Sequence, residues 1–143
     1  MPEFARTFVS RMRQFVGDRR RAKRVDARLP FTISLVGPAV NSNGHKRVST
    51  LSGHTLDLSI TGLALIVPRI LLGEHHLVWE ARDLDVKLEL PERAVAMRVA
   101  PIRYESLDEH ETETGYLIGA RIVAMDDDDE KFFKTYVAKL LDG

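Results

Sequence analysis

A cluster of cationic side chains spans residues 19–24, where the sequence reads Arg-Arg-Arg-Ala-Lys-Arg. Five cations in six residues repel one another and cannot form part of an apolar core. The arginine guanidinium offers planar donors that suit phosphate oxygens, and its flat face can stack on a nucleobase. Arg20 and Arg24 are four residues apart, so a turn-like conformation would bring both side chains to one side. The cluster indicates either an anion-binding arm or a solvated basic linker that docks on an acidic part of the chain.

A second polar group lies between Asp57 and Gly62, in the segment Asp-Leu-Ser-Ile-Thr-Gly. Because side chains alternate along a strand, Asp57 and Ser59 are expected to share one face of a sheet. A carboxylate and a hydroxyl at the end of a strand can accept hydrogen bonds from the polar edge of a ligand. Gly62 fits a bend that needs a positive φ or a close backbone approach. The alternative is a plain turn, in which Asp57 and Ser59 bond only to the nearby backbone.

Patterns typical of catalysis and metal binding are missing from the sequence. The absence of cysteine excludes a thiol nucleophile, a thiolate metal site and a disulfide framework. The five histidines lack metal-ligand spacing, and we expect them at the surface or in turns; His75 and His76 are adjacent and would point to opposite faces of a strand. The sequence contains no nucleophile elbow, Walker A motif or dinucleotide-binding fingerprint. We therefore expect no enzyme activity, no resident metal and no cofactor.

The spacing of apolar residues predicts the elements that position these groups. Residues 84–90 alternate between apolar and charged side chains, which is typical of a half-buried strand. Amphipathic helices are predicted over residues 2–16 and 127–141, with the run Asp126–Glu130 at the start of the second, where an aspartate can cap. Six strands in succession favour an antiparallel barrel or sandwich, with the last helix covering an opening or a face. The six predicted strands are 31–36, 48–59, 62–67, 84–90, 94–104 and 116–125.

Length and composition fit one globular domain, with 143 residues, 44% hydrophobic and 29% charged. The net charge of zero hides an asymmetry. Residues 1–28 hold nine Lys and Arg against three Asp and Glu, whereas residues 101–143 hold five against eleven. No apolar run approaches the roughly 20 residues that span a bilayer, and arginines interrupt the N-terminal segment, so we expect a cytoplasmic protein.

The two polar groups, in this order within a six-strand β domain, resemble the PilZ domain family. Arg20-x-x-x-Arg24 matches the R-x-x-x-R motif of that family, and Asp57-x-Ser59-x-x-Gly62 matches its [D/N]-x-S-x-x-G motif. The pair Arg24 and Arg28 fits the first motif as well. The position of Leu29-Pro30, which looks like the entry of the family into its first strand, favours Arg20 and Arg24.

The resemblance covers about residues 18–141 and implies a six-stranded antiparallel β-barrel. The expected organisation is an N-terminal amphipathic helix over 1–17 and a PilZ-like barrel domain over 18–143. This domain includes an arginine arm, 18–30, and the C-terminal helix, 127–141. Residues 1–17 lie outside the family core, so their role is not implied by the resemblance.

PilZ domains are receptors for the bacterial second messenger cyclic di-GMP, and the resemblance implies this ligand here. Guanine presents two acceptors on its Hoogsteen edge, which suit a guanidinium, and N–H donors on its Watson–Crick edge, which need an acceptor such as Asp57. An arm with no apolar groups to bury is expected to be mobile, to fold onto the barrel with the ligand, and to pass the signal to a downstream protein. The implied ligand-binding residues are Arg19, Arg20, Arg24, Asp57, Ser59 and Gly62. Arg19 precedes the first motif and resembles the case of two stacked nucleotides.

Other interpretations remain open. The domain could be a nucleotide-independent adaptor for another protein. A second alternative is a basic-arm module that binds nucleic acid, although we expect no nucleic acid partner, because only Phe15 is aromatic near the arm and the remaining sequence is not basic. The helix over 1–17 could contact a membrane through Phe4, Phe8 and Phe15, although packing on the barrel or on a second copy in a homodimer is favoured.

Overall fold

The computed structural model describes residues 22–35, 50–107 and 115–143. The six longer strands confirm those expected from the apolar pattern, each within two residues of the predicted bounds, and α2 confirms the C-terminal helix. The helix expected over 2–16 lies outside the described residues. The elements are β1 (Val25–Asp26), β2 (Pro30–Leu35), β3 (Thr50–Leu58), β4 (Gly62–Val67), β5 (Leu71–Leu72), β6 (His75–His76), β7 (Leu84–Glu89), β8 (Ala94–Ser106), β9 (Tyr116–Met125) and α2 (Asp127–Asp142).

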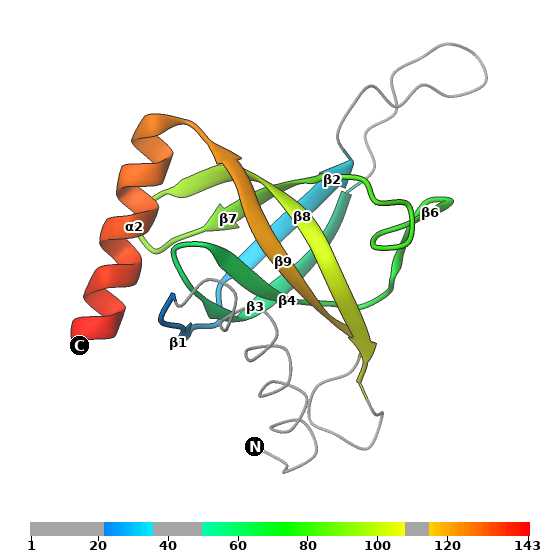
Figure 1. Cartoon of the computed structure of the whole chain (residues 1–143), viewed down its shortest axis with the longest axis horizontal. Helices are drawn as coiled ribbons and strands as arrows, with labels where there is room; N and C mark the ends of the chain where they lie inside the picture. The colour runs from blue at the N-terminus through cyan, green and yellow to red at the C-terminus, as the bar shows by residue number, and fades with distance from the viewer. Residues whose placement is uncertain (1–21, 36–49, 108–114) are drawn as a thin grey trace.

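The six long strands form a closed antiparallel barrel (Figure 1). Its order is β3-β2-β7-β8-β9-β4, and β4 pairs back onto β3. The short strand β1 pairs with the last residues of β3, whereas β2 pairs with the first five, so the two strands follow one another along one side of β3. Because a closed sheet has no free edge, each long strand is held in register on both sides.

The interior of the barrel follows the alternation that the sequence predicts. In β7, Leu84, Val86 and Leu88 are buried in the main core, whereas Lys87 and Glu89 are exposed. Removing such apolar side chains from water is the main driving force for folding of a domain of this size. The barrel wall therefore takes its inward and outward faces directly from the sequence.

Strand β4 is buried along its whole length because it has an apolar layer on both faces. Leu63, Leu65 and Val67 belong to the main core inside the barrel, whereas Ala64 and Ile66 belong to a separate cluster on the outer face. The outer cluster consists of Leu56, Ala64, Ile66, Leu107 and Leu117. This outer face of β3, β4 and β9 is also where the candidate site lies.

Helix α2 covers one end of the barrel (Figure 1). Phe133 and Val137 are fully buried in the same core as the residues inside the barrel. Asp129 ties the first turn of the helix to the barrel, because it accepts a hydrogen bond from the Ala96 N–H at 2.9 Å and forms an ion pair with Arg93. The helix is thus joined to the barrel by apolar packing and by polar contacts.

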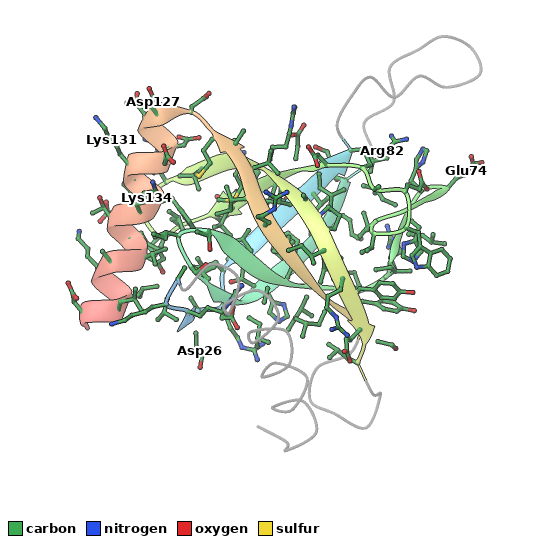
Figure 2. The ribbon with its side chains drawn as sticks, viewed as in Figure 1. Asp26, Glu74, Arg82, Asp127, Lys131 and Lys134 are labelled. Carbon is green, nitrogen blue, oxygen red and sulfur yellow. The ribbon has the colours of Figure 1, made fainter. Side chains whose placement is uncertain are left out.

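The expectation that an aspartate side chain caps α2 is wrong for Asp126. This residue occupies the N-cap position, but its side chain makes no capping hydrogen bond; only its carbonyl oxygen accepts the Glu130 N–H, at 2.8 Å. The acidic first turn still lies at the positive end of the helix dipole, which is favourable. Asp127, Lys131 and Lys134 of α2, which are labelled in Figure 2, are exposed.

The segment between β4 and β7 forms a short hairpin of β5 and β6, far from α2 (Figure 1). The sequence pattern missed this hairpin because strands of two residues have no readable period. His76 is buried, which corrects the expectation of a surface histidine. Its Nδ1 accepts the N–H groups of Val78 and Trp79 at 3.1 and 3.0 Å, and its ring stacks on Trp79 with centroids 3.9 Å apart. His76 thereby holds the exposed Trp79 in place.

We expect His76 to make the hairpin sensitive to acid. Burial lowers the pKa of His76 from 6.5, and the Glu80 carboxylate opposes only part of this effect. The native state therefore binds a proton less readily than the unfolded chain, so stability falls as the pH drops below about 6.5. The Tm of the wild type should fall further between about pH 7.5 and 5.5 than that of His76→Asn, whose amide oxygen accepts hydrogen bonds but does not titrate. Parallel Tm profiles would contradict this role.

We expect the packing of α2 to be essential for stability. Replacing the fully buried Phe133 with alanine should lower the free energy of unfolding by about 3–5 kcal/mol, because it removes apolar contacts and leaves a cavity. Chemical denaturation measures this change. Leu141→Ala, at an exposed position of the same helix, is the control and should change stability by less than about 0.5 kcal/mol. Equal effects of the two variants would show that α2 is not packed as described.

Candidate ligand-binding site

Arg24 and Asp57, one from each motif, meet in a buried ion pair. The Nη1 atom of Arg24 donates to the Oδ1 atom of Asp57 at 2.8 Å. The exposed fractions of the two side chains are 6% and 2%. The contact joins residues 33 positions apart, and the pairing of β1 with β3, in which Asp26 lies opposite Asp57, brings them together. A hydrogen bond between charged groups is stronger than one between neutral groups.

A bulge in β3 turns Asp57 to the outer face of the barrel. Thr55 pairs with the inward-facing Leu65, but Asp57 pairs with the outward-facing Ala64, and Leu56 is the extra residue between them. In a regular strand Thr55 and Asp57 would point to the same side. The bulge therefore places the carboxylate on the outer face of the barrel instead of inside the apolar core.

Thr55 holds the junction between β1 and β2 in place. Its Oγ1 donates to the Ala27 carbonyl at 2.5 Å and accepts the Leu29 N–H at 2.9 Å. Its own N–H donates to the Leu29 carbonyl at 2.9 Å. Thr55 was not among the residues predicted for the site, although a threonine at an inward position of an apolar strand was a signal that could have identified it. Thr55 thus fixes the chain that carries Arg24.

Ser59 builds the turn that follows β3. Its Oγ accepts the N–H groups of Thr61 and Gly62 at 3.2 and 3.0 Å, and the Ser59 N–H donates to the Gly62 carbonyl at 2.9 Å. The Thr61 carbonyl then accepts the Ile122 N–H at 2.9 Å, which ties the turn to β9. These are the hydrogen bonds of a turn-forming serine.

Of the two reasons expected for a glycine at position 62, a positive φ or a close backbone approach, the structure contradicts the positive φ. Within the described ranges the glycines with positive φ are Gly73 and Gly115. Gly62 is instead the first residue of β4, where extended backbone is required, and it pairs with Arg121 of β9.

A row of directly paired residues crosses the outer face next to the ion pair. Asp57 on β3 lies opposite Ala64 on β4, which lies opposite Gly119 on β9, which lies opposite Arg103 on β8. Neighbouring strands are about 4.8 Å apart, so Asp57 and Arg103 stand at the ends of a row about 14 Å wide. Neither motif includes this row. The signal in the sequence that could have identified it was a small residue at an outward position of each of two neighbouring strands, Ala64 and Gly119.

The Nε atom of Arg24 has no hydrogen-bond partner. Among the side chains that the structure describes, it is the one buried polar atom left unsatisfied. A buried unpaired donor on a charged group costs at least about 1–3 kcal/mol. Such an atom beside a buried carboxylate is a position where an acceptor from a ligand would be stabilising.

The remaining arginines of the arm have different positions. The Nη1 atom of Arg28 lies 3.0 Å from the Nε2 atom of His54, at an exposed position, so Arg24 and not Arg28 meets Asp57. Arg24 is therefore not docked on the acidic C-terminal region. Arg19 and Arg20 lie outside the described residues.

The described residues include no group of three or more His, Cys, Asp or Glu side chains that could hold a metal ion. None of the helices seen in these ranges is long and apolar enough to cross a membrane. The Arg24–Asp57 pair is the arrangement that the rest of the site is built around.

Comparison with known proteins defines the family of this barrel. A sequence model of the PilZ domain matches residues 18–139. The chain belongs to the PilZ domain family. This match confirms the resemblance to the family that the two motifs indicated. The PilZ barrel confirms the expected fold class. A comparison with curated proteins found no match.

Solved structures share this PilZ fold. The PilZ domain of YcgR from Escherichia coli with c-di-GMP is 14% identical, with a TM-score of 0.58, over 87% of this chain and 92% of that one. The inhibitor of motility MotI/DgrA from Bacillus subtilis is 16% identical, with a TM-score of 0.58, over 85% and 50%. The PlzA protein of Borreliella burgdorferi in complex with c-di-GMP is 14% identical, with a TM-score of 0.50, over 93% and 55%. This chain thus spans about half the length of the MotI and PlzA chains.

We expect Thr55→Val to destabilise the barrel although it preserves the shape of the side chain. The substitution leaves the Leu29 N–H without its partner, so the free energy of unfolding should fall by about 1–3 kcal/mol. Ser52→Ala, at an exposed position of the same strand, is the control and should change it by less than about 0.5 kcal/mol. Denaturant unfolding measures both. Equal stabilities would mean that the Thr55 hydroxyl does not hold the junction.

Proposed function

We propose that this PilZ domain is a receptor for cyclic di-GMP, which binds on the outer face of the barrel at Arg24 and Asp57. The observation that carries the proposal is the meeting of the two motifs in one buried pair that retains an unsatisfied arginine donor. Membership of the PilZ family supports the ligand class. The E. coli YcgR and B. burgdorferi PlzA structures, which share the fold, contain c-di-GMP.

The chemistry of the ligand suits these side chains. Cyclic di-GMP carries two guanine bases and two phosphates. In the proposed complex, Arg20 and Arg24 bind guanine and phosphate acceptors, and Arg24 gains a partner for its Nε atom. A carboxylate has about four lone-pair positions, so Asp57 can hold Arg24 and also accept guanine N–H donors.

The turn contributes shape as well as contacts. Ser59 holds the backbone of the turn through its Oγ, and Gly62 adds no side chain at the start of β4. In the proposed complex the Ser59 hydroxyl lies at a phosphate or a base. Arg19, the residue before the first motif, would bear on whether one nucleotide or a stacked pair binds.

Burial of the ion pair links binding to conformational change. A ligand reaches Arg24 and Asp57 only if neighbouring residues move aside, because both side chains are almost fully buried. We propose that the arginine arm folds around the ligand and re-aims residues 1–17, and that a downstream protein recognises this change. A ligand can shift such an equilibrium only by its difference in affinity for the two states.

The expected affinity is micromolar or tighter. A hydrogen bond to a charged group contributes about 1.5–3 kcal/mol net. Two or three such bonds together with base stacking reach about 8 kcal/mol after ordering costs, which corresponds to a Kd of about 1 μM. The proposed role is binding and signalling, not catalysis.

Titration calorimetry with cyclic di-GMP tests the proposal. We expect saturable binding by the wild type and a loss of at least about tenfold in affinity for Arg20→Ala and for Arg24→Lys. The lysine keeps a cation beside Asp57, so the buried carboxylate is not left unpaired, but it removes the Nε donor and the planar fork.

Arg82→Ala is the matched control, because Arg82 lies on the far side of the barrel from Asp26, the residue opposite Asp57 (Figure 2). It should leave the Kd unchanged. Thermal unfolding of each variant separates lost binding from lost folding. A wild type that does not bind, or binding that survives both substitutions in folded protein, would overturn the proposal.

A further inference from the structure

We propose that Arg121 is a further ligand-binding residue, which contacts a phosphate of the dinucleotide from the side of the site opposite Arg24. This inference rests on the proposed function and extends it. Arg121 belongs to neither sequence motif, and the register of β9 against β4 points to it.

Arg121 lies on the outer face at the turn that the second motif forms. In β9, Ile118 and Ala120 are fully buried, whereas Gly119 pairs with the outward-facing Ala64 and Arg121 follows two residues later on the same face. Arg121 is directly opposite Gly62. Because Gly62 has no side chain, nothing at that position blocks the arginine from reaching across the start of β4.

The side chain of Arg121 is exposed and has no partner. Most other arginines of the described barrel have one: Arg24 pairs with Asp57, Arg93 with Asp129, Arg98 with Asp85 and Arg103 with Glu105. Within the described residues, Arg121 makes no side-chain hydrogen bond or ion pair. Its charge is therefore available to an anion from outside the chain.

Arg121 lies across the site from the arginine of the first motif. On the β1 side, the charge of Arg24 is offset by Asp57. Arg121 is three strand spacings from β1, or about 14 Å along the sheet, and brings a cation to the β9 side. Arg24 and Arg121 can thus hold one ligand from two sides.

Titration calorimetry with cyclic di-GMP at two salt concentrations tests this role. We expect Arg121→Ala to weaken binding by about tenfold and Arg121→Glu by more, whereas Arg121→Lys keeps most of the affinity because a lysine also contacts phosphate. The dependence of the Kd on salt should be smaller for Arg121→Ala than for the wild type, because one phosphate contact is lost. A merely structural role would not change the salt dependence.

Arg69→Ala is the matched control. Arg69 is likewise exposed, but it lies beside the β5–β6 hairpin: the carbonyl of the next residue, Ile70, accepts a backbone hydrogen bond from Leu77. It should leave both the Kd and its salt dependence unchanged. The Tm of all these variants should equal that of the wild type, because both positions are exposed.

The outcomes separate this inference from the proposed function. If the wild type binds and Arg24→Lys does not, but Arg121→Ala behaves as Arg69→Ala, the role of Arg121 is wrong and the receptor function stands. If the wild type does not bind cyclic di-GMP, both proposals are wrong. Weaker binding by Arg121→Ala with an unchanged salt dependence would exclude a phosphate contact.

Discussion

Burial of the ion pair between Arg24 and Asp57 is the constraint on which the other features of this site depend. Taking two charges out of water costs several kcal/mol for each ion, and their attraction offsets this cost only when the geometry is good and the remaining polar atoms are satisfied. Here the geometry is good, with 2.8 Å between donor and acceptor, but the Nε atom of Arg24 is left without a partner. The site is therefore assembled but incomplete, which is the condition in which a ligand with acceptor atoms gains most.

Irregular backbone around a regular barrel makes this arrangement. The closed sheet and α2 supply a rigid wall, and its strands pair without interruption over most of their length. Three exceptions lie at the site: the bulge at Leu56, the β1–β2 junction held by Thr55, and the turn held by Ser59. Two further register shifts lie in the pairing of β8 with β9. Each of the three features at the site gives a side chain or a segment a direction that it would not have in a regular strand. The proposed site thus lies where the regular pairing of the sheet is interrupted.

Local patterns predicted most of the fold. Alternation in β7 and the apolar stripe of α2 reflect burial of one face, which the order of residues encodes directly. The predictions failed where the position of a side chain depends on contacts that no local pattern shows. Asp126 does not cap the helix, and instead Asp129 reaches Arg93 and Ala96 on the barrel. His76 is buried by a hairpin too short to be read from any period.

The sequence by itself predicted the six long strands, the C-terminal helix and a resemblance to the PilZ family that the family model confirms. It left open whether Arg20 and Arg24 or Arg24 and Arg28 form the first motif, although Leu29-Pro30 favoured the first pair, and it could not show that Arg24 lies at Asp57. Only the tertiary structure placed Arg24 there, and only the pairing of β4 with β9 brought Arg121 opposite Gly62. The physical reason is that a contact between residues 33 positions apart depends on strand register, and one extra residue in a strand moves every later side chain to the other face. Hydrophobic patterns specify which residues are buried, but the bulge that turns Asp57 outward is a property of paired strands.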